Sequence, residues 1–106
     1  MIVMSDKIEL NMKTATRLIE AFNNDDWDEV RAVTVANYTL NHPLGGRISA
    51  GPEALIKEWK EFKAALPDSW HPIPIMIAED DYVAVNLPTY GRFTGESHKG
   101  VKPTGK

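Results

Sequence analysis

The sequence predicts a single α+β domain, with helices concentrated in the first two thirds of the chain and two extended segments after them. In three segments the apolar residues recur at steps of three and four, which is the spacing of one helix face. In other segments they alternate with period two, which is typical of a half-buried strand. The chain has 106 residues, of which 42% are hydrophobic and 25% charged, so we expect residues 1–106 to form one globular domain.

The first two helices are predicted from apolar stripes and from capping residues. Ser5 is expected to cap a long helix whose apolar positions run over residues 8–22. The polar residues 23–25 end this helix, and Asp26 is expected to cap a short second helix over residues 27–33. The two together predict a helical hairpin.

A strand and a third helix follow. Residues 36–42 alternate, with Tyr38, Leu40 and His42 on one side, and Pro43-Leu44-Gly45-Gly46 is expected to end that strand. A third helix is predicted to open at Gly51-Pro52-Glu53, since proline at the first helical position loses no hydrogen bond. The apolar face of this helix consists of Leu55, Trp59, Phe62 and Leu66, and Pro67-Asp68 is expected to end the helix.

The last part of the chain is interpreted as a hairpin. Its two extended segments cover residues 70–79 and 82–94, and the acidic turn Asp80-Asp81 joins them. We expect an inward face on each strand, made of Ile73, Ile75 and Ile77 on the first and of Val83, Val85 and Leu87 on the second. Proline cannot donate to a ladder, so Pro72, Pro74 and Pro88 are expected at edges or bulges.

Composition and charge exclude several classes of partner and site. There are 12 basic and 15 acidic side chains and no basic run, so we expect no nucleic-acid partner. There is no cysteine, which excludes disulfides, thiolate metal sites and a cysteine nucleophile. No apolar stretch approaches the roughly 20 residues that span a bilayer, and the opening Met-Ile-Val-Met is too short for a signal peptide. We therefore expect a cytoplasmic protein that does not bind membranes.

Neither a metal nor a cofactor is expected. His71 and His98 stand alone in the sequence, and no pair of side chains has the spacing that zinc sites use. Residues 100–106 match the glycine and lysine positions of a phosphate-binding loop. That motif needs a following Ser or Thr and a helix start, neither of which the sequence supplies, so we do not expect a nucleotide site.

Four motifs carry a family resemblance: Phe22-Asn23-Asn24-Asp25-Asp26-Trp27-Asp28; Tyr38-Thr39-Leu40-Asn41-His42-Pro43; Leu66-Pro67-Asp68 with Ile77-Ala78-Glu79-Asp80-Asp81-Tyr82-Val83-Ala84-Val85; and Gly91-Arg92-Phe93-Thr94-Gly95-Glu96 with Pro103-Thr104-Gly105-Lys106. Over about residues 10 to 106 the chain resembles SnoaL-like polyketide cyclases, a branch of the superfamily of nuclear transport factor two and ketosteroid isomerases. The resemblance implies a curved antiparallel or mixed sheet, wrapped around three helices as a cone-shaped barrel that encloses an apolar cavity.

The resemblance also implies two departures from the family. In the family the sheet continues beyond "P-T-G-K", and the acid/base carboxylate lies on the next strand, so we expect this chain to be C-terminally short and to lack that residue. Arg92-Phe93 stands where many members have a histidine. Without the further strands, residues 82–94 would expose unpaired backbone groups beside an apolar face. We therefore expect a homodimer or a swapped oligomer to complete the sheet.

His42 is the candidate catalytic residue. It ends a strand whose other inward residues are Tyr38 and Leu40, so its imidazole is expected to point into the cavity that the resemblance implies. A neutral histidine there would orient a carbonyl group or shuttle a proton. The alternative is a satisfied, half-buried histidine at a strand end, and both interpretations stay open.

Candidate ligand-binding residues are mainly aromatic, because aromatic surface stacks against an aromatic or polycyclic ligand. They are Tyr38, Trp27, Trp59, Phe62, Tyr90 and Arg92. For the helical members the alternative is plain core packing. Tyr90 and Arg92 turn inward if Pro88 makes a bulge; otherwise they face solvent or a subunit partner.

Two functions follow from the resemblance. The first is a cyclase or isomerase that acts by proton transfer on a small apolar carbonyl compound, such as a polyketide or terpenoid, with His42 as the polar anchor. The alternative is a binding or assembly module that has lost the acid/base residue and binds an apolar ligand without converting it.

Overall fold

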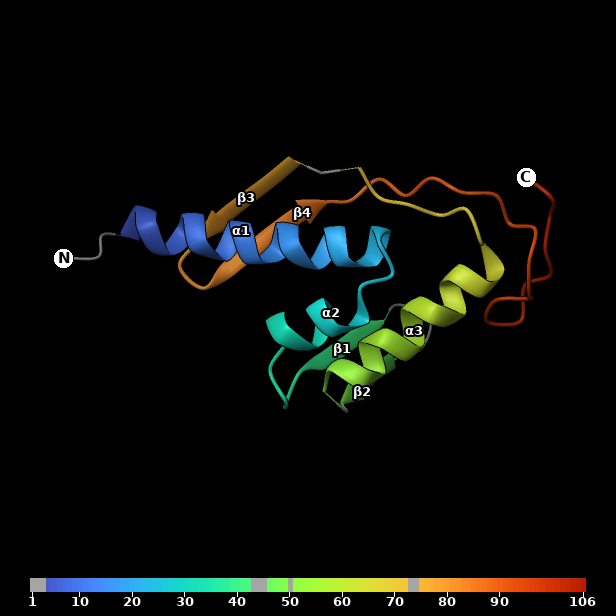
Figure 1. Ribbon diagram of the computed structural model, residues 1–106, viewed down its shortest axis with the longest axis horizontal. Helices are drawn as coiled ribbons and strands as arrows, with labels where there is room; N and C mark the ends of the chain where they lie inside the picture. The colour runs from blue at the N-terminus through green and yellow to red at the C-terminus, as the bar shows by residue number, and fades with distance from the viewer. Residues whose placement is uncertain (1–3, 43–45, 50, 73–74) are drawn as a thin grey trace.

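The computed structural model describes residues 4–42, 46–49, 51–72 and 75–106, and in this part of the chain helices and strands mix as the α+β prediction requires (Figure 1). The helices are α1 (Met4–Asn23), α2 (Trp27–Val33) and α3 (Pro52–Ala65). The strands are β1 (Thr39–His42), β2 (Gly46–Ser49), β3 (Ile75–Glu79) and β4 (Tyr82–Asn86). The predicted fold class is therefore confirmed.

The three predicted helices form, with one correction at a helix start. α1 begins at Met4, so Ser5 lies within its first turn and is not its cap. Asp26 caps α2 as predicted, since its Oδ1 accepts a hydrogen bond from the backbone N of Glu29 at 3.2 Å. Pro52 opens α3 as predicted, after Gly51 in a left-handed conformation (φ 70°).

The strands pair as two separate antiparallel hairpins, and a curved sheet that joins them stays a prediction of the resemblance. In the first hairpin Thr39 of β1 lies opposite Ser49 of β2, a strand that sequence patterns did not indicate. The predicted second hairpin is confirmed, with Ile75 of β3 opposite Asn86 of β4. Beyond the ladder an isolated bridge joins Trp70 to Tyr90, whose backbone N–H groups each donate to the other's carbonyl oxygen at 2.9 and 3.0 Å.

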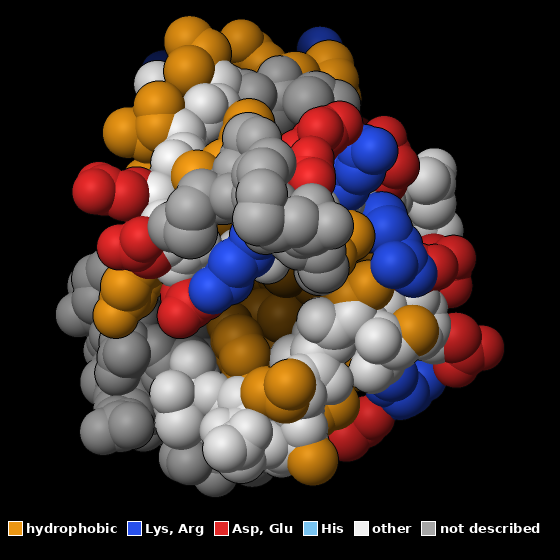
Figure 2. Space-filling model, turned by 90° about the vertical axis from the view of Figure 1, so that its left-hand side faces the viewer, with side chains coloured by type: hydrophobic (Ala, Val, Ile, Leu, Met, Phe, Trp, Pro, Cys, Tyr) orange, Lys and Arg blue, Asp and Glu red, His pale blue; other side chains and the backbone are white. Residues whose placement is uncertain are grey.

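The prediction for the inward face of β3 was wrong. Ile75 and Ile77 are 77% and 71% exposed. The opposite face packs on α1, where Oγ1 of Thr16 lies 3.7 Å from the sulfur of Met76. Period-two alternation shows which residues share a face, but only the position of α1 decides which face is covered. Figure 2 shows hydrophobic side chains gathered at the top of the molecule, where this hairpin lies.

The core lies between the three helices. Four buried side chains from α1, α2 and α3 form its centre: Ala21, Val30, Leu55 and Ile56. The chain as a whole is elongated, with extents of 53 × 27 × 24 Å and a radius of gyration of 15.1 Å. A compact chain of this length has a radius of gyration of about 13 Å, so this chain leaves more surface uncovered than a closed domain does. None of the described helices has the length and apolar character needed to cross a bilayer.

The C-terminal segment folds back over the end of α3. The backbone N of Gly95 donates to the carbonyl of Ala65, and that of Glu96 donates to the carbonyl of Ala64, both at 2.9 Å. The approach is so close that a Cβ at position 95 would lie 1.9 Å from the oxygen of Ala64, which explains the glycine. This contact brings residues 98–101 next to the side of α3 that carries Glu58 and Phe62.

Candidate functional site

A cavity of about 210 Å³ lies between α1, α3 and two chain segments, one that precedes β3 and one that follows β4. One part of its wall is apolar and consists of Phe22, Trp59, Phe62 and Leu87. The polar part consists of Glu58, His71, Thr89 and His98. These residues come from α1, α3 and the segments around residues 71, 87–89 and 98, so the cavity exists only in the folded chain.

The aromatic wall is centred on Phe22, which is fully buried. Its ring meets Trp59 edge-on, with centroids 5.0 Å apart and an interplanar angle of 77°. It lies 6.4 Å from the ring of Phe62 and 4.4 Å from the imidazole of His71. Edge-to-face and tilted arrangements at these distances are favourable. Phe22 therefore supports both the apolar wall and the histidine.

His71 is buried and has a defined tautomer. Its Nδ1 lies 3.2 Å from the carbonyl oxygen of Pro88 and 2.9 Å from Oγ1 of Thr89. A carbonyl oxygen only accepts hydrogen bonds, so Nδ1 carries the proton and Nε2 of the neutral ring is left as the base. Burial lowers the pKa of His71, the Pro88 carbonyl opposes this, and the charge of Lys63 lowers the pKa further. His71 is therefore a neutral imidazole at pH 7.

Asn23 holds the backbone of His71 in place. Its side-chain Nδ2 donates to the carbonyl oxygen of His71 at 2.5 Å, and the backbone N of His71 donates to its Oδ1 at 2.7 Å. One amide side chain thus satisfies both backbone groups of a residue 48 positions away, as a neighbouring strand would. This gives a structural role to the asparagine of the Phe-Asn motif at the end of α1.

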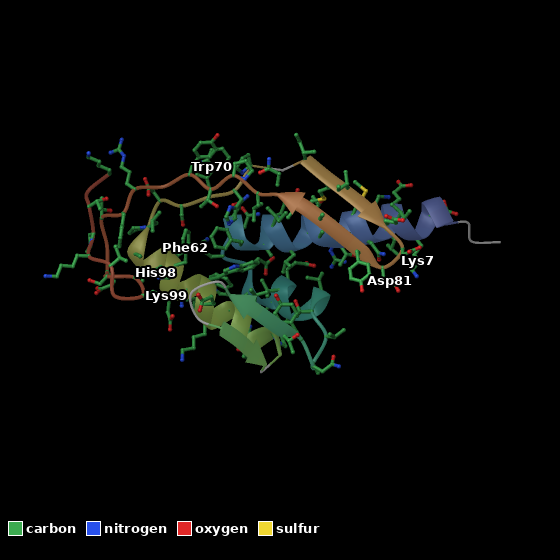
Figure 3. All side chains as sticks on the ribbon, turned by 180° about the vertical axis from the view of Figure 1, so that it is seen from behind. Lys7, Phe62, Trp70, Asp81, His98 and Lys99 are labelled. Carbon is green, nitrogen blue, oxygen red and sulfur yellow. The ribbon has the colours of Figure 1, made fainter. Side chains whose placement is uncertain are left out.

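Glu58 brings a carboxylate to the cavity wall. Glu58 is 9% exposed, and its Oε1 lies 2.9 Å from the Nζ of Lys99. Lys99 occupies a tight two-residue turn between His98 and Val101, with φ 48°. The imidazole of His98 packs edge-on against Phe62 at 5.7 Å. Figure 3 shows Phe62, His98 and Lys99 together beside α3, whereas Trp70 points away from the helices.

The lowered pKa of His71 predicts an acid-sensitive contribution to stability. Above about pH 6.5, the usual pKa of histidine, the folded and unfolded chains both hold a neutral ring, so His71 adds no pH dependence. Below it, the unfolded chain binds a proton that the folded chain does not, so the free energy of unfolding falls until the pH reaches the lowered folded-state pKa. We expect His71→Gln to lose this part of the acid response in urea unfolding measured from about pH 7.5 to 5. An unchanged slope would contradict the assignment, and His98→Gln is the control.

The structure places the sequence-predicted residues in three groups. Trp59 and Phe62 lie in the cavity wall. Trp27 and Tyr38 pack against the buried cluster between the helices instead, and burial raises the pKa of the Tyr38 hydroxyl. The backbone of His42 lies in β1, but its side chain lies outside the described residues, so its roles stay predictions.

Tyr90 and Arg92 take the outward alternative. Tyr90 is 56% exposed, and its ring lies 5.5 Å from that of Trp70. Arg92 is also exposed, and its backbone N donates to Oδ1 of Asp68 at 2.8 Å. Pro88 interrupts the ladder without reversing the alternation, so Leu87 and Thr89 face the cavity while Tyr90 faces away.

Sequence reasoning missed Glu58, His71, Thr89 and His98 as cavity residues. His71 and His98 looked isolated because no local spacing links them. One signal was available for Thr89, since the inward alternation of Val83, Val85 and Leu87 continues to it. No local pattern indicated Glu58, which lies in an ordinary helical sequence of charged residues.

A second hollow lacks the aromatic wall of this cavity. A shallow hollow of about 400 Å³ on α3 is lined mainly by Lys and Glu side chains, and it has no aromatic wall. Among the residues that the structure describes, no three metal-ligating side chains come together. The aromatic cavity is therefore the candidate site.

Comparison with known proteins gives one match. A family model described as SnoaL-like polyketide cyclase matches residues 13–106, and this span includes every residue of the cavity wall. None of the curated proteins or solved structures searched matches the chain. The matched span includes both the helices and the segments that enclose the cavity, and it covers well over half of the chain. The chain therefore belongs to the SnoaL-like polyketide cyclase family.

Proposed function

We propose that the cavity binds a small apolar carbonyl compound and moves a proton within it. The observation that carries this proposal is the combination, in one cavity, of an aromatic wall with Glu58, His71 and His98. Ligand sites in proteins typically join apolar walls to a few convergent polar groups, and proton transfer needs titratable groups within reach of the ligand. Family membership supports a small-molecule-binding domain.

The cavity size limits the ligand. Pockets for drug-sized molecules have volumes of about 300–1,000 Å³, and this cavity has about 210 Å³. A compound of one or two rings, such as a small aromatic ketone or a monoterpenoid, suits this space better than a large fused-ring polyketide. The half-buried aromatic rings provide stacking surface, and the neutral imidazole of His71 is a hydrogen-bonding partner for a carbonyl or enol oxygen.

Tryptophan fluorescence tests binding with the two-ring ketone 2-tetralone as the probe. The chain has three tryptophans, of which Trp59 lies in the cavity wall and Trp70 is 49% exposed on the outer face. We expect saturable quenching that Trp59→Phe abolishes and that the matched control Trp70→Phe preserves. Non-saturable quenching, or saturable quenching that survives in Trp59→Phe, would contradict the proposed site.

We also propose that a second copy of the chain covers the outer face of the β3–β4 hairpin. Three large side chains stand on this face, Ile75, Ile77 and Tyr82, and Tyr82 is 79% exposed. The described strands include no further partner for either edge of this hairpin, and contiguous exposed apolar surface of this kind is typical of an interface. We also propose, separately, that the protein is located in the cytoplasm.

The self-association predicts a specific response to mutation. At micromolar concentration we expect light scattering to give twice the chain mass for the wild type and a single chain mass for Ile77→Lys, because a charge on this face opposes burial. Val35→Lys is the matched control, since Val35 is 65% exposed in the loop after α2. A monomeric wild type would refute the dimer.

A further inference from the structure

We propose that this cavity selects compounds that carry a hydroxyl group, because the polar atom that the fold holds ready for a ligand, Nε2 of His71, accepts a hydrogen bond and cannot donate one. The ligand class is an uncharged phenol, or the enol form of a small cyclic ketone. This inference rests on the proposed function and names the form of ligand that the same cavity binds best.

One nitrogen of the His71 ring is occupied by the protein. Nδ1 lies 3.2 Å from the carbonyl oxygen of Pro88, which only accepts hydrogen bonds, so the ring proton lies on Nδ1. The hydroxyl of Thr89 lies 2.9 Å from Nδ1 at an exposed position, where it can accept from the same N–H group and donate to water. A proton on Nε2 instead would set the lone pair of Nδ1 against those of the carbonyl oxygen. The contacts therefore stabilise one tautomer.

The other nitrogen, Nε2, is open to the cavity. His71 is 7% exposed and lines the cavity wall. No described residue forms a hydrogen bond with Nε2, yet the only buried side-chain polar atom without a partner in the described part of the chain is Oγ of Ser69. Nε2 therefore keeps contact with the space of the cavity. Phe22 covers one face of the imidazole, with ring centroids 4.4 Å apart and a tilt of 37°, so a ligand approaches along the ring edge, where the lone pair points.

The orientation of this acceptor is fixed before a ligand arrives. The Asn23 amide holds the backbone of His71 through hydrogen bonds of 2.5 and 2.7 Å. Rotation of the ring would break the contact between Nδ1 and the Pro88 carbonyl and would move the ring away from Phe22. A ligand therefore does not have to order this group on binding, which favours affinity for a compound that matches it.

The other polar groups of the cavity wall do not reverse the preference. Glu58 contributes a carboxylate, paired with Lys99, and a carboxylate also only accepts hydrogen bonds. The imidazole of His98 packs edge-on against Phe62, and none of the hydrogen bonds among described residues fixes its proton. Because that proton can lie on either nitrogen, His98 adapts to a donor or to an acceptor. His71, whose proton is fixed, is therefore the group that discriminates.

A hydroxyl and a carbonyl oxygen differ at this acceptor. A phenol or an enol donates its O–H to Nε2 while its rings lie beside Trp59 and Phe62. A ketone oxygen has lone pairs only, so it meets Nε2 without a hydrogen bond although both atoms lose water. Polar groups left unpaired in this way are the usual source of selectivity against an analogue that lacks the matching donor. We therefore expect the cavity to favour the enol form of a ketone over its keto form.

Isothermal titration calorimetry with three probes of the same two-ring skeleton tests the preference. 6-Hydroxytetralin carries a hydroxyl group, 2-tetralone carries a carbonyl group, and tetralin carries no oxygen. We expect the wild-type chain to bind 6-hydroxytetralin about tenfold more tightly than 2-tetralone, which is roughly the contribution of one hydrogen bond.

Two aromatic substitutions assign the preference to His71. His71→Phe keeps a flat ring and removes Nε2, so we expect it to bind 6-hydroxytetralin and 2-tetralone with nearly equal affinity and to bind tetralin as the wild type does. Trp70→Phe is the matched control, because it changes the neighbouring residue, whose side chain is 49% exposed on the outer face. It is expected to keep the tenfold preference of about one hydrogen bond. Circular dichroism melting curves show whether each variant is folded.

Nitrogen NMR of the wild-type chain tests the same inference without a change at His71. Long-range proton–nitrogen spectra of protein labelled at histidine show which ring nitrogen carries the proton. The signals of the three histidines are assigned with His42→Gln and His98→Gln. We expect His71 to carry its proton on Nδ1, and we expect its Nε2 signal to shift when 6-hydroxytetralin is added and to stay in place when tetralin is added.

The outcomes separate this inference from the proposed function. If none of the three probes binds, the proposed binding site is wrong and the inference falls with it. If they bind without a preference for the hydroxyl group, or if folded His71→Phe keeps the preference, the binding function stands and the role of His71 is refuted. If His71→Phe does not fold, the NMR spectra decide: a proton on Nε2, or an Nε2 signal that 6-hydroxytetralin leaves unchanged, refutes the inference.

Discussion

Replacement of Phe22 by alanine is expected to lower the free energy of unfolding by about 3–5 kcal/mol, the usual cost of truncating a buried phenylalanine. The side chain is fully buried, and its ring contacts Trp59, Phe62 and His71. Domains of this size have total stabilities of about 5–15 kcal/mol, so the loss is a large part of the whole. Urea unfolding followed by circular dichroism measures it.

The control for Phe22 is another phenylalanine. Phe93 is half-buried in the C-terminal segment, so Phe93→Ala should cost clearly less than Phe22→Ala. Phe22→Leu should fall between the wild type and Phe22→Ala, because it retains part of the buried apolar volume. Equal urea midpoints for Phe22→Ala and the wild type would show that this ring is not at the centre of the packing.

Replacement of Asn23 by alanine is expected to lower the free energy of unfolding by about 2–6 kcal/mol, because it leaves two backbone groups of His71 without their partner and each unsatisfied group costs about 1–3 kcal/mol. The lost bonds are the contacts of 2.5 and 2.7 Å between the Asn23 amide and the His71 backbone. Since these contacts also hold the histidine in the cavity, we expect weaker quenching of Trp59 by 2-tetralone. Urea unfolding and the fluorescence titration measure the two effects.

Two variants sharpen the test of Asn23. Asn24→Ala, at the exposed neighbouring position, should change stability little. Asn23→Asp keeps an acceptor for the His71 N–H but sets a second acceptor against the His71 carbonyl, so it should also destabilise the fold. If Asn23→Ala behaves as Asn24→Ala does, the asparagine does not position His71.

Two adjacent side chains at the end of α1 act together on His71. Phe22 and Asn23 are adjacent at the end of α1, and both act on His71, one through its ring and the other through its backbone. Lys63 links α3 to the same end of α1. Its ammonium group lies 4.3 Å from the centre of the Phe22 ring and pairs with Asp25. The end of α1 therefore joins the helical core to the cavity.

The local structure of this protein follows from signals between residues that are close in the sequence. The apolar stripes, the cap at Asp26 and the proline at the start of α3 are short-range signals, because their partners lie within a few residues. The β3–β4 hairpin is of the same kind, since the acidic turn brings its strands together directly. The family resemblance also rests on short motifs, and the family match confirms it.

The cavity and the faces that line it depend on how the helices and strands pack together. Ile75 and Ile77 face outward because α1 covers the opposite side of β3, and the alternation of apolar residues is the same for either choice. His71 and Glu58 line one cavity because the chain returns to α3 and α1 through contacts between residues distant in sequence, such as the pair of Asn23 and His71. Periodicity and capping report on neighbours along the chain, whereas a site assembled from distant segments depends on how the packed elements meet in space.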